Sequence, residues 1–132
     1  MKFNKYDHGF TLIELLVTVS IIGVLAAIAI PQFSSYRARS FDARSLQDLR
    51  SAATAEEAYF VDYERYANCI GAAACEAALP AFSASAGVTV YMFRVNIPGT
   101  PEYFTGRTFH PKGNHYNSAT AWNWDSNGGG LQ

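Results

Sequence analysis

The sequence predicts an α+β protein: one long N-terminal helix, apolar in its first half and amphipathic in its second, packed on a small antiparallel β-sheet. An almost unbroken apolar run extends from Phe10 to Ile30. Residues 31–65 then repeat apolar side chains at three- and four-residue steps, which is the period of a helix. Runs of β-branched and aromatic residues, typical of strands, begin at Val88. The 132 residues leave room for one modest domain.

The overall charge is close to balanced, with 10 Lys and Arg against 11 Asp and Glu. We expect no nucleic-acid partner, because such a partner calls for a basic surplus. The sequence has no long charged or low-complexity run that would indicate disorder, and no internal repeat.

Residues 10–30 are predicted to span a membrane. They hold about 21 residues with a single charge, Glu14, and a bilayer core of roughly 30 Å needs about 20. Lys2 and Lys5 precede the run with only Asp7 against them, which keeps the N-terminus in the cytoplasm and the rest of the chain outside. A secretory signal peptide fits poorly, because the run is too long and no A-x-A site closes it. A generic membrane anchor remains an alternative.

The start of the apolar run carries a family signature. Residues 9–33, GFTLIELLVTVSIIGVLAAIAIPQF, resemble the N-terminal signature of type IV pilins and of their relatives, the pseudopilins. The resemblance implies that prepilin peptidase removes residues 1–9 as a leader by cutting between Gly9 and Phe10, and that Phe10 is then N-methylated. Looser similarity continues to about Tyr66, and the implied architecture is the pilin fold.

Glu14 is the polar exception within the span, and it becomes the fifth residue of the mature chain. An ionised carboxylate at bilayer depth is costly and is usually paired. In the fibre its natural partner is the α-amino group of Phe10 on a neighbouring subunit, and this pairing sets the axial register of assembly. The alternatives are a carboxylate that snorkels to the interface and one partly satisfied by its own helix N-terminus.

Gly23 and Ala27, four residues apart, give small surface for close helix packing. The alternative is the ordinary tolerance of small residues in membrane spans. Pro31 lacks an N–H and clashes with the preceding turn, so a kink is predicted there. By resemblance, residues 23–31 are the segment that unwinds in the assembled pilus.

The second half of the helix has one predicted apolar stripe, formed by Leu46, Leu49, Ala53, Phe60 and Tyr63. Charged residues mostly occupy the other faces: Arg44, Asp48, Arg50, Glu57, Asp62 and Glu64. No further Gly or Pro intervenes before Gly71. One helix is therefore predicted from Phe10 to Arg65, kinked at Pro31.

Residues 66–87 form an Ala- and Gly-rich loop with both cysteines, Cys69 and Cys75. Two nearby cysteines outside the cytoplasm are expected to form a disulfide. Two free buried thiols are the alternative, and the spacing does not match a zinc site.

A three-stranded antiparallel meander is predicted over residues 88–125 and completes a head domain of residues 31–132. Its strands are Val88–Ile97, Tyr103–Phe109 and Ala119–Asp125, separated by turns at 98–102 and 110–114. Residues 126–132 form a Gly-rich tail.

The sequence contains no recognisable catalytic motif, so we expect no enzyme, no cofactor and no metal. His110 and His115 flank a turn. Asp125 and Asn127 precede glycines and suggest a calcium loop, but one carboxylate is too few for an oxygen cage.

The predicted function is a structural subunit of a type IV pilus, polymerised from the inner membrane into an extracellular fibre for adhesion, motility or related surface functions. Its partners are further copies of itself, prepilin peptidase, the pilus assembly machinery and, before assembly, the inner membrane. The alternatives are a pseudopilin or minor pilin of a type II secretion system, an electron-conducting pilus subunit suggested by the aromatic side chains along the helix, and a membrane-anchored enzyme or binding protein.

Overall fold

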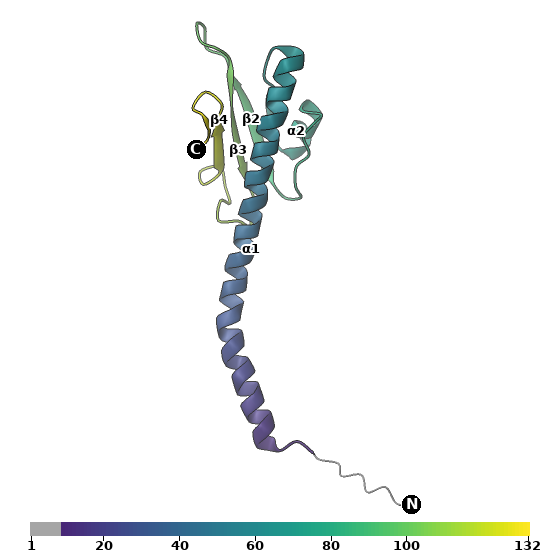
Figure 1. Ribbon diagram of the computed structural model, residues 1–132, viewed down its shortest axis with the longest axis vertical. Coiled ribbons are helices and arrows are strands. Elements are labelled where there is room, and N and C mark those ends of the chain that lie inside the picture. Colours follow the sequence, from purple (N-terminus) through teal and green to yellow (C-terminus); the bar gives the residue numbers. More distant parts are fainter. Residues whose placement is uncertain (1–8) are drawn as a thin grey trace, which may run out of the picture. The chain divides into compact units, whose positions relative to one another are not determined.

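The computed structural model describes residues 9–132 and has the predicted α+β architecture (Figure 1). The long helix α1 spans Leu12–Tyr63, close to the predicted bounds, and a short helix α2 spans Ala72–Ala78. The chain divides into two compact units, residues 1–36 and 37–132. Each unit is described by itself.

The second unit contains a five-stranded antiparallel sheet whose strands lie side by side in chain order. The strands are β1 Cys69–Ile70, β2 Thr89–Val95, β3 Tyr103–Phe109, β4 Trp122–Asp125 and β5 Gly130–Leu131. The central pairing joins β2 to β3, from Thr89 opposite Phe109 to Val95 opposite Tyr103. The sheet is therefore a meander, which needs no crossover connection.

Side chains of β2 and β3 alternate between a face that packs on α1 and an outer face. Val90, Met92, Phe104 and Thr108 belong to the inner face and are fully buried. The Thr108 hydroxyl donates a hydrogen bond of 2.7 Å to the backbone carbonyl of Ser45 in α1. The inner face of the sheet thus packs against α1.

The helix and the sheet approach each other closely at Gly106 of β3. A Cβ at this position would lie 3.0 Å from Leu49 Cδ1 and 2.8 Å from Met92 Sδ. Leu49 is fully buried, and such burial stabilises the fold by about 1.5–3 kcal/mol. Glycine at position 106 therefore lets α1 lie close enough for Leu49 to pack on the sheet.

The buried stripe of α1 differs from the predicted one. Leu49 and Ala53 are buried as predicted, but Tyr63 is 57% exposed. The buried face also carries four polar residues: Asp42, Ser45, Asp48 and Glu56. One of them, Asp48, was predicted to lie on another face of the helix. Each of the three carboxylates accepts a hydrogen bond from a backbone N–H of a different connecting segment. The apolar pattern of the sequence does not reveal these buried positions, because their side chains are polar and bind the backbone of connecting segments.

The predicted disulfide is present and lies in the core. Cys69 of β1 and Cys75 of α2 are joined, with their Cα atoms 4.9 Å apart, and both are buried. Closing so short a loop contributes about 2 kcal/mol through the unfolded state. The surrounding segment is more ordered than the predicted loop, because it contains both β1 and α2.

The sheet has two more strands than predicted, and two of the predicted strands are shorter: Val88–Ile97 is reduced to Thr89–Val95, and Ala119–Asp125 to Trp122–Asp125. The strand predicted from Ala119 begins only at Trp122, because the Asn117 side chain accepts hydrogen bonds from the backbone N–H groups of Ala119 and Thr120 and holds them in a turn. The tail, predicted without structure, supplies β5. β1 and β5 have two residues each, too few to produce an alternating pattern.

Glu56 is a fully buried carboxyl near the C-terminal end of α1. Its Oε2 accepts a 2.9 Å hydrogen bond from the backbone N–H of Ala67, and Oε1 has no hydrogen-bond partner among the described residues. Burial raises the pKa of Glu56 to about 7; the Glu57 charge adds to this rise and the Ala67 hydrogen bond opposes it. The protonated carboxyl is therefore favoured in the folded chain below neutral pH.

We predict that Glu56→Gln removes a pH-dependent part of the stability. The pKa of this carboxyl is higher in the folded chain than its unfolded value of about 4.3. Its contribution to the free energy of unfolding is therefore fully present below about pH 4.3 and is lost as the pH rises through about 7. Between pH 4.5 and 8 the free energy of unfolding of the wild type should therefore fall by up to about 3 kcal/mol more than that of the variant. Urea unfolding of the detergent-solubilised full chain measures this, with Asp62→Asn as the exposed control. Parallel wild-type and Glu56→Gln profiles would contradict it.

Candidate assembly surface

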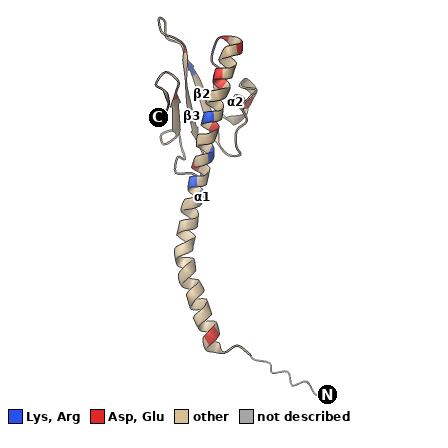
Figure 2. Cartoon of the chain, in the orientation of Figure 1, with Lys and Arg blue, Asp and Glu red and all other residues tan. Residues whose placement is uncertain are grey.

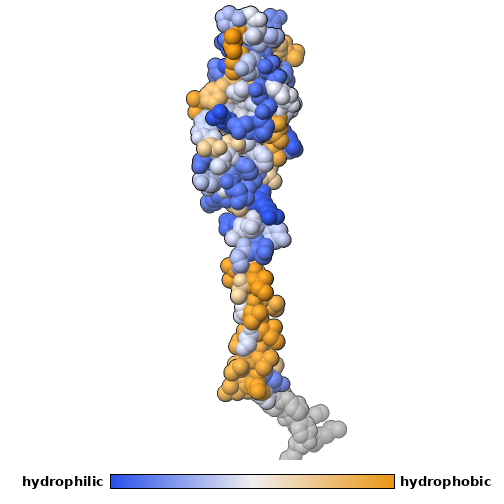
Figure 3. Space-filling model, turned by 90° about the vertical axis from the view of Figure 1, so that its left-hand side faces the viewer, coloured by the Kyte–Doolittle hydropathy of each residue, from blue (hydrophilic) through white to orange (hydrophobic). Residues whose placement is uncertain are grey.

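The first unit presents an almost wholly apolar helix surface (Figure 3). Its large apolar side chains range from 49% exposed at Val17 to 88% at Phe10. α1 is long enough and apolar enough to cross a membrane. Figure 2 shows a single acidic position at the start of the helix, which is Glu14.

Glu14 closes a capping box at the first turn of α1. The backbone N–H and the hydroxyl of Thr11 each donate a hydrogen bond of 2.8 Å to Glu14 Oε2, and the Glu14 N–H lies 3.3 Å from the Thr11 hydroxyl oxygen. Both bonds from Thr11 go to the same oxygen. Among the described residues Oε1 has no hydrogen-bond donor. Glu14 also lines a shallow hollow of about 360 Å³, together with Phe10, Ile13, Val17 and Thr18.

The hydroxyl groups of the apolar stretch are satisfied within the helix. Thr18 donates to the Glu14 carbonyl at 2.7 Å, and Ser20 donates to the Leu16 carbonyl at 2.8 Å. Neither side chain requires an outside partner at bilayer depth. The second oxygen of Glu14 is thus the exceptional polar group of this surface.

α1 continues as a helix through both Gly23 and Pro31. A Cβ on Gly23 would meet no atom within 4 Å, so nothing in the described chain requires glycine there. Pro31 has no N–H to donate to the carbonyl of Ala27, four residues before it. The kink and the unwinding of residues 23–31 stay predictions.

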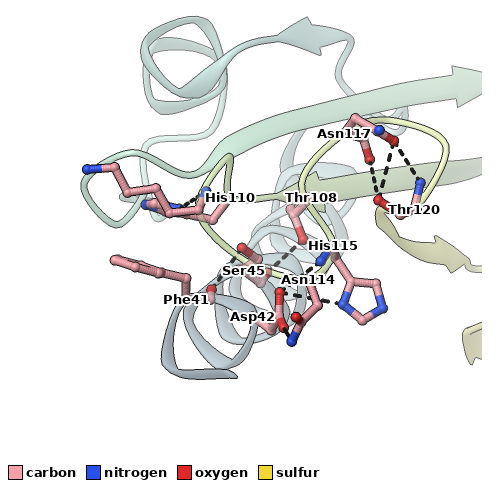
Figure 4. A network of polar contacts seen from close by, with 10 residues as sticks. Phe41, Asp42, Ser45, Thr108, His110, Asn114, His115, Asn117 and Thr120 are labelled. Atoms are coloured by element: carbon pink, nitrogen blue, oxygen red, sulfur yellow. Dashed lines mark hydrogen bonds and ion pairs between the residues drawn. The ribbon is translucent and has the colours of Figure 1, made fainter. Parts of the chain in front are cut away.

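A polar network centred on Asp42 fastens the turn between β3 and β4 to α1 (Figure 4). Asp42 accepts hydrogen bonds from Asn114 Nδ2 at 2.8 Å and from the His115 backbone N–H at 3.0 Å. His115 Nδ1 lies 3.5 Å from the same carboxylate, and the imidazole stacks on Trp122 with centroids 4.1 Å apart. Burial raises the pKa of Asp42, but hydrogen bonds from His115 and Asn114 outweigh it, so the pKa lies below its ordinary value.

A second contact beside this network joins the same turn to α1. His110 stacks on Phe41 at 4.2 Å, and the guanidinium groups of Arg37 and Arg44 lie 5.8 and 5.7 Å from the centroid of Phe41. Burial lowers the pKa of His110, and the charges of Lys112 and Arg44 lower it further. Sequence reasoning placed His110 and His115 only at a turn, because their partners in α1 lie about 70 residues away.

Comparisons with known proteins place a family motif at the N-terminus and find relatives that match about half of the chain. A family model described as the prokaryotic N-terminal methylation motif matches residues 4–30. The chain is 47% identical over 67 residues to the type IV major pilin protein PilA of Myxococcus xanthus, covering 51% of this chain and 30% of the relative. It is 48% identical over 66 residues to the type IV major fimbrial protein FimA of Dichelobacter nodosus, covering 50% and 41%.

The chain is similar to the type IV pilins. A third relative, the type IV major pilin protein PilE1 of Neisseria gonorrhoeae, is 32% identical over 63 residues, 48% of this chain and 38% of the relative. The matches span less than half the length of each of these relatives.

The processing sites precede the helix. Gly9 and Phe10 come before α1, and residues 1–8 of the predicted leader lie outside the part of the chain that the structure describes. Cleavage after Gly9 and methylation of Phe10 therefore stay predictions here.

We predict that Asp42→Ala destabilises the second unit by about 2 kcal/mol at neutral pH, because it leaves the His115 N–H without its acceptor. Since the folded pKa of Asp42 is depressed, its contribution is present above its unfolded pKa of about 3.9 and is lost as pH falls below that value. The difference in the free energy of unfolding between wild type and variant should be smaller at pH 3 than at neutral pH. Urea unfolding at both pH values measures this, with Asp62→Ala as control, and an equal gap at both would refute it.

Proposed function

We propose that this chain is the structural subunit of a type IV pilus, held in the inner membrane by residues 10–30 before assembly and packed through the same residues in the fibre. The observation that carries the proposal is the exposed apolar surface of α1, which holds one carboxylate oxygen free for a partner. Such a surface is unfavourable in water and requires lipid or other apolar helices.

The free Glu14 oxygen suits an amine donor from a neighbouring copy. Oε2 is occupied by Thr11, so Oε1 can accept from the α-amino group that cleavage after Gly9 creates on Phe10 of the next subunit. A pair formed in this apolar setting is costly to break, because each partner would be left as an unpaired charge. The pairing would then fix the axial position of each incoming subunit.

The names of the relatives favour a pilus over the secretion apparatus. The matched proteins are called major pilins and fimbrial proteins. The further partners that we propose are prepilin peptidase and the pilus assembly machinery, with the N-terminus on the cytoplasmic side before assembly and the fibre outside the cell.

We predict that Glu14→Ala and Glu14→Gln each reduce the yield of sheared surface fibres at least roughly tenfold, while the membrane content of subunit stays within about twofold. The glutamine variant separates two roles, because glutamine also closes a capping box but carries no charge. Asp62→Ala, an exposed acidic position of α1, is the control. Normal fibre yield from Glu14→Gln would refute charge pairing and leave only a helix-capping role.

We predict that subunits in fibres begin at Phe10 and carry one added methyl group on its nitrogen. Mass spectrometry of the N-terminal peptide measures both changes. Gly9→Val should block processing, leaving the full-length chain in the membrane and no fibres. Fibres built from chains that begin at Met1 would contradict the processing assignment.

A further inference from the structure

We propose that the outer face of the sheet binds a neutral carbohydrate, in an open hollow between β3 and β4 beside a row of aromatic rings. The hollow measures about 330 Å³ and is lined by the polar residues Thr105, Arg107, Asn123, Asp125 and Gln132. A volume of this order accommodates a small ligand such as one or two sugar rings. The site lies wholly within the second unit.

Strand register places these groups on one face. Thr105 pairs with Asp125, and Arg107 pairs with Asn123, while the intervening residues of β3, such as Gly106, face α1. Side chains directly opposite on paired strands lie about 4.5–5.5 Å apart at Cβ. Four polar side chains from two strands therefore surround one small area.

These groups retain unused hydrogen-bonding capacity. Arg107 is exposed and makes no ion pair or hydrogen bond through its side chain to another residue within 9–132. Asp125 Oδ1 accepts from the N–H groups of Asn127 and Gly128, which leaves Oδ2 free. Asn123 donates through Nδ2 to a backbone carbonyl and keeps Oδ1 as an acceptor. The hollow thus offers a planar guanidinium fork together with carboxylate and amide oxygens.

An aromatic row borders the hollow on β2. Tyr91 lies opposite Arg107, and Phe93 lies opposite Thr105. The rings of Tyr91 and Phe93 are nearly parallel, at 5° with centroids 6.3 Å apart, and Phe109 of β3 continues the row 6.1 Å from Tyr91. Electron-rich ring faces attract polarised C–H groups such as those on one side of a pyranose. The aromatic rings suit the C–H groups of a sugar, and the neighbouring hydrogen-bonding groups suit its hydroxyl groups.

The charge of the hollow argues against other ligands. The hollow holds one cation, Arg107, and one anion, Asp125, so it lacks the positive groove that a single-stranded nucleic acid requires. Two charged groups and free amides are also unlike the core of an interface between protein copies, which is depleted of charge. A neutral ligand rich in hydroxyl groups uses both donors and acceptors.

The test is saturation-transfer NMR on the detergent-solubilised full chain with lactose, cellobiose and maltose at about 10 mM, in the range expected for weak sugar binding. At least one disaccharide should receive saturation, with a dissociation constant that Arg107→Ala and Tyr91→Ala each raise roughly tenfold or more. Arg50→Ala and Tyr116→Ala remove an exposed arginine and an exposed tyrosine elsewhere and should change it by less than about twofold.

Three results would overturn the proposal. They are no saturation of any disaccharide, equal binding by the wild type and by both site variants, and displacement of the sugar by an oligothymidylate at lower concentration, which would indicate a nucleic-acid surface. Circular dichroism of each variant confirms folding. The Glu14→Gln variant should bind the sugar as the wild type does, so failure of fibre assembly and failure of sugar binding are separately visible.

Discussion

Between Phe10 and Ile30 the large apolar side chains are exposed in the described chain, and this apolar surface constrains the polar groups beside it. In lipid, or among other helices, every polar group must find a partner. The hydroxyls of Thr18 and Ser20 satisfy this requirement by bonding back to the helix, and Thr11 satisfies one oxygen of Glu14. The second oxygen of Glu14 is left without a donor among the described residues.

The second half of α1 meets a different demand, because it must hold connecting segments that have few apolar residues of their own. Asp42, Asp48 and Glu56 each accept a backbone N–H from a separate segment, at His115, Ser85 and Ala67. Buried carboxylates are expensive unless hydrogen-bonded, and a wrong pairing leaves them unsatisfied. They therefore specify where each segment docks. Leu49 and the buried alanines between Asp48 and Glu56 supply the apolar contacts that stabilise the docked segments.

The parts of the fold that sequence predicted are those in which many neighbouring residues carry the same signal. The apolar run, the alternating strands β2 and β3 and the cysteine pair are of this kind. Sequence reasoning missed the Asp48 anchor and the Asp42–His115 network, because each depends on one residue whose partner is distant in the chain. It missed α2 for another reason: Ala72–Ala78 starts after Gly71 with no side-chain cap, so no local start signal exists. Packing through Cys75 determines that helix.

The two faces of the sheet are under unequal constraint. The inner face must be apolar and close-fitting, as Gly106 and Met92 show where they meet Leu49. Stability imposes no comparable demand on the outer face, where a soluble sheet ordinarily carries polar residues. Tyr91, Phe93 and Phe109 form an aromatic row there instead, beside an arginine and a carboxylate with free hydrogen-bonding capacity. Phe93 is exposed and Tyr91 and Phe109 are half-buried, so part of each ring stays available to a ligand on that face.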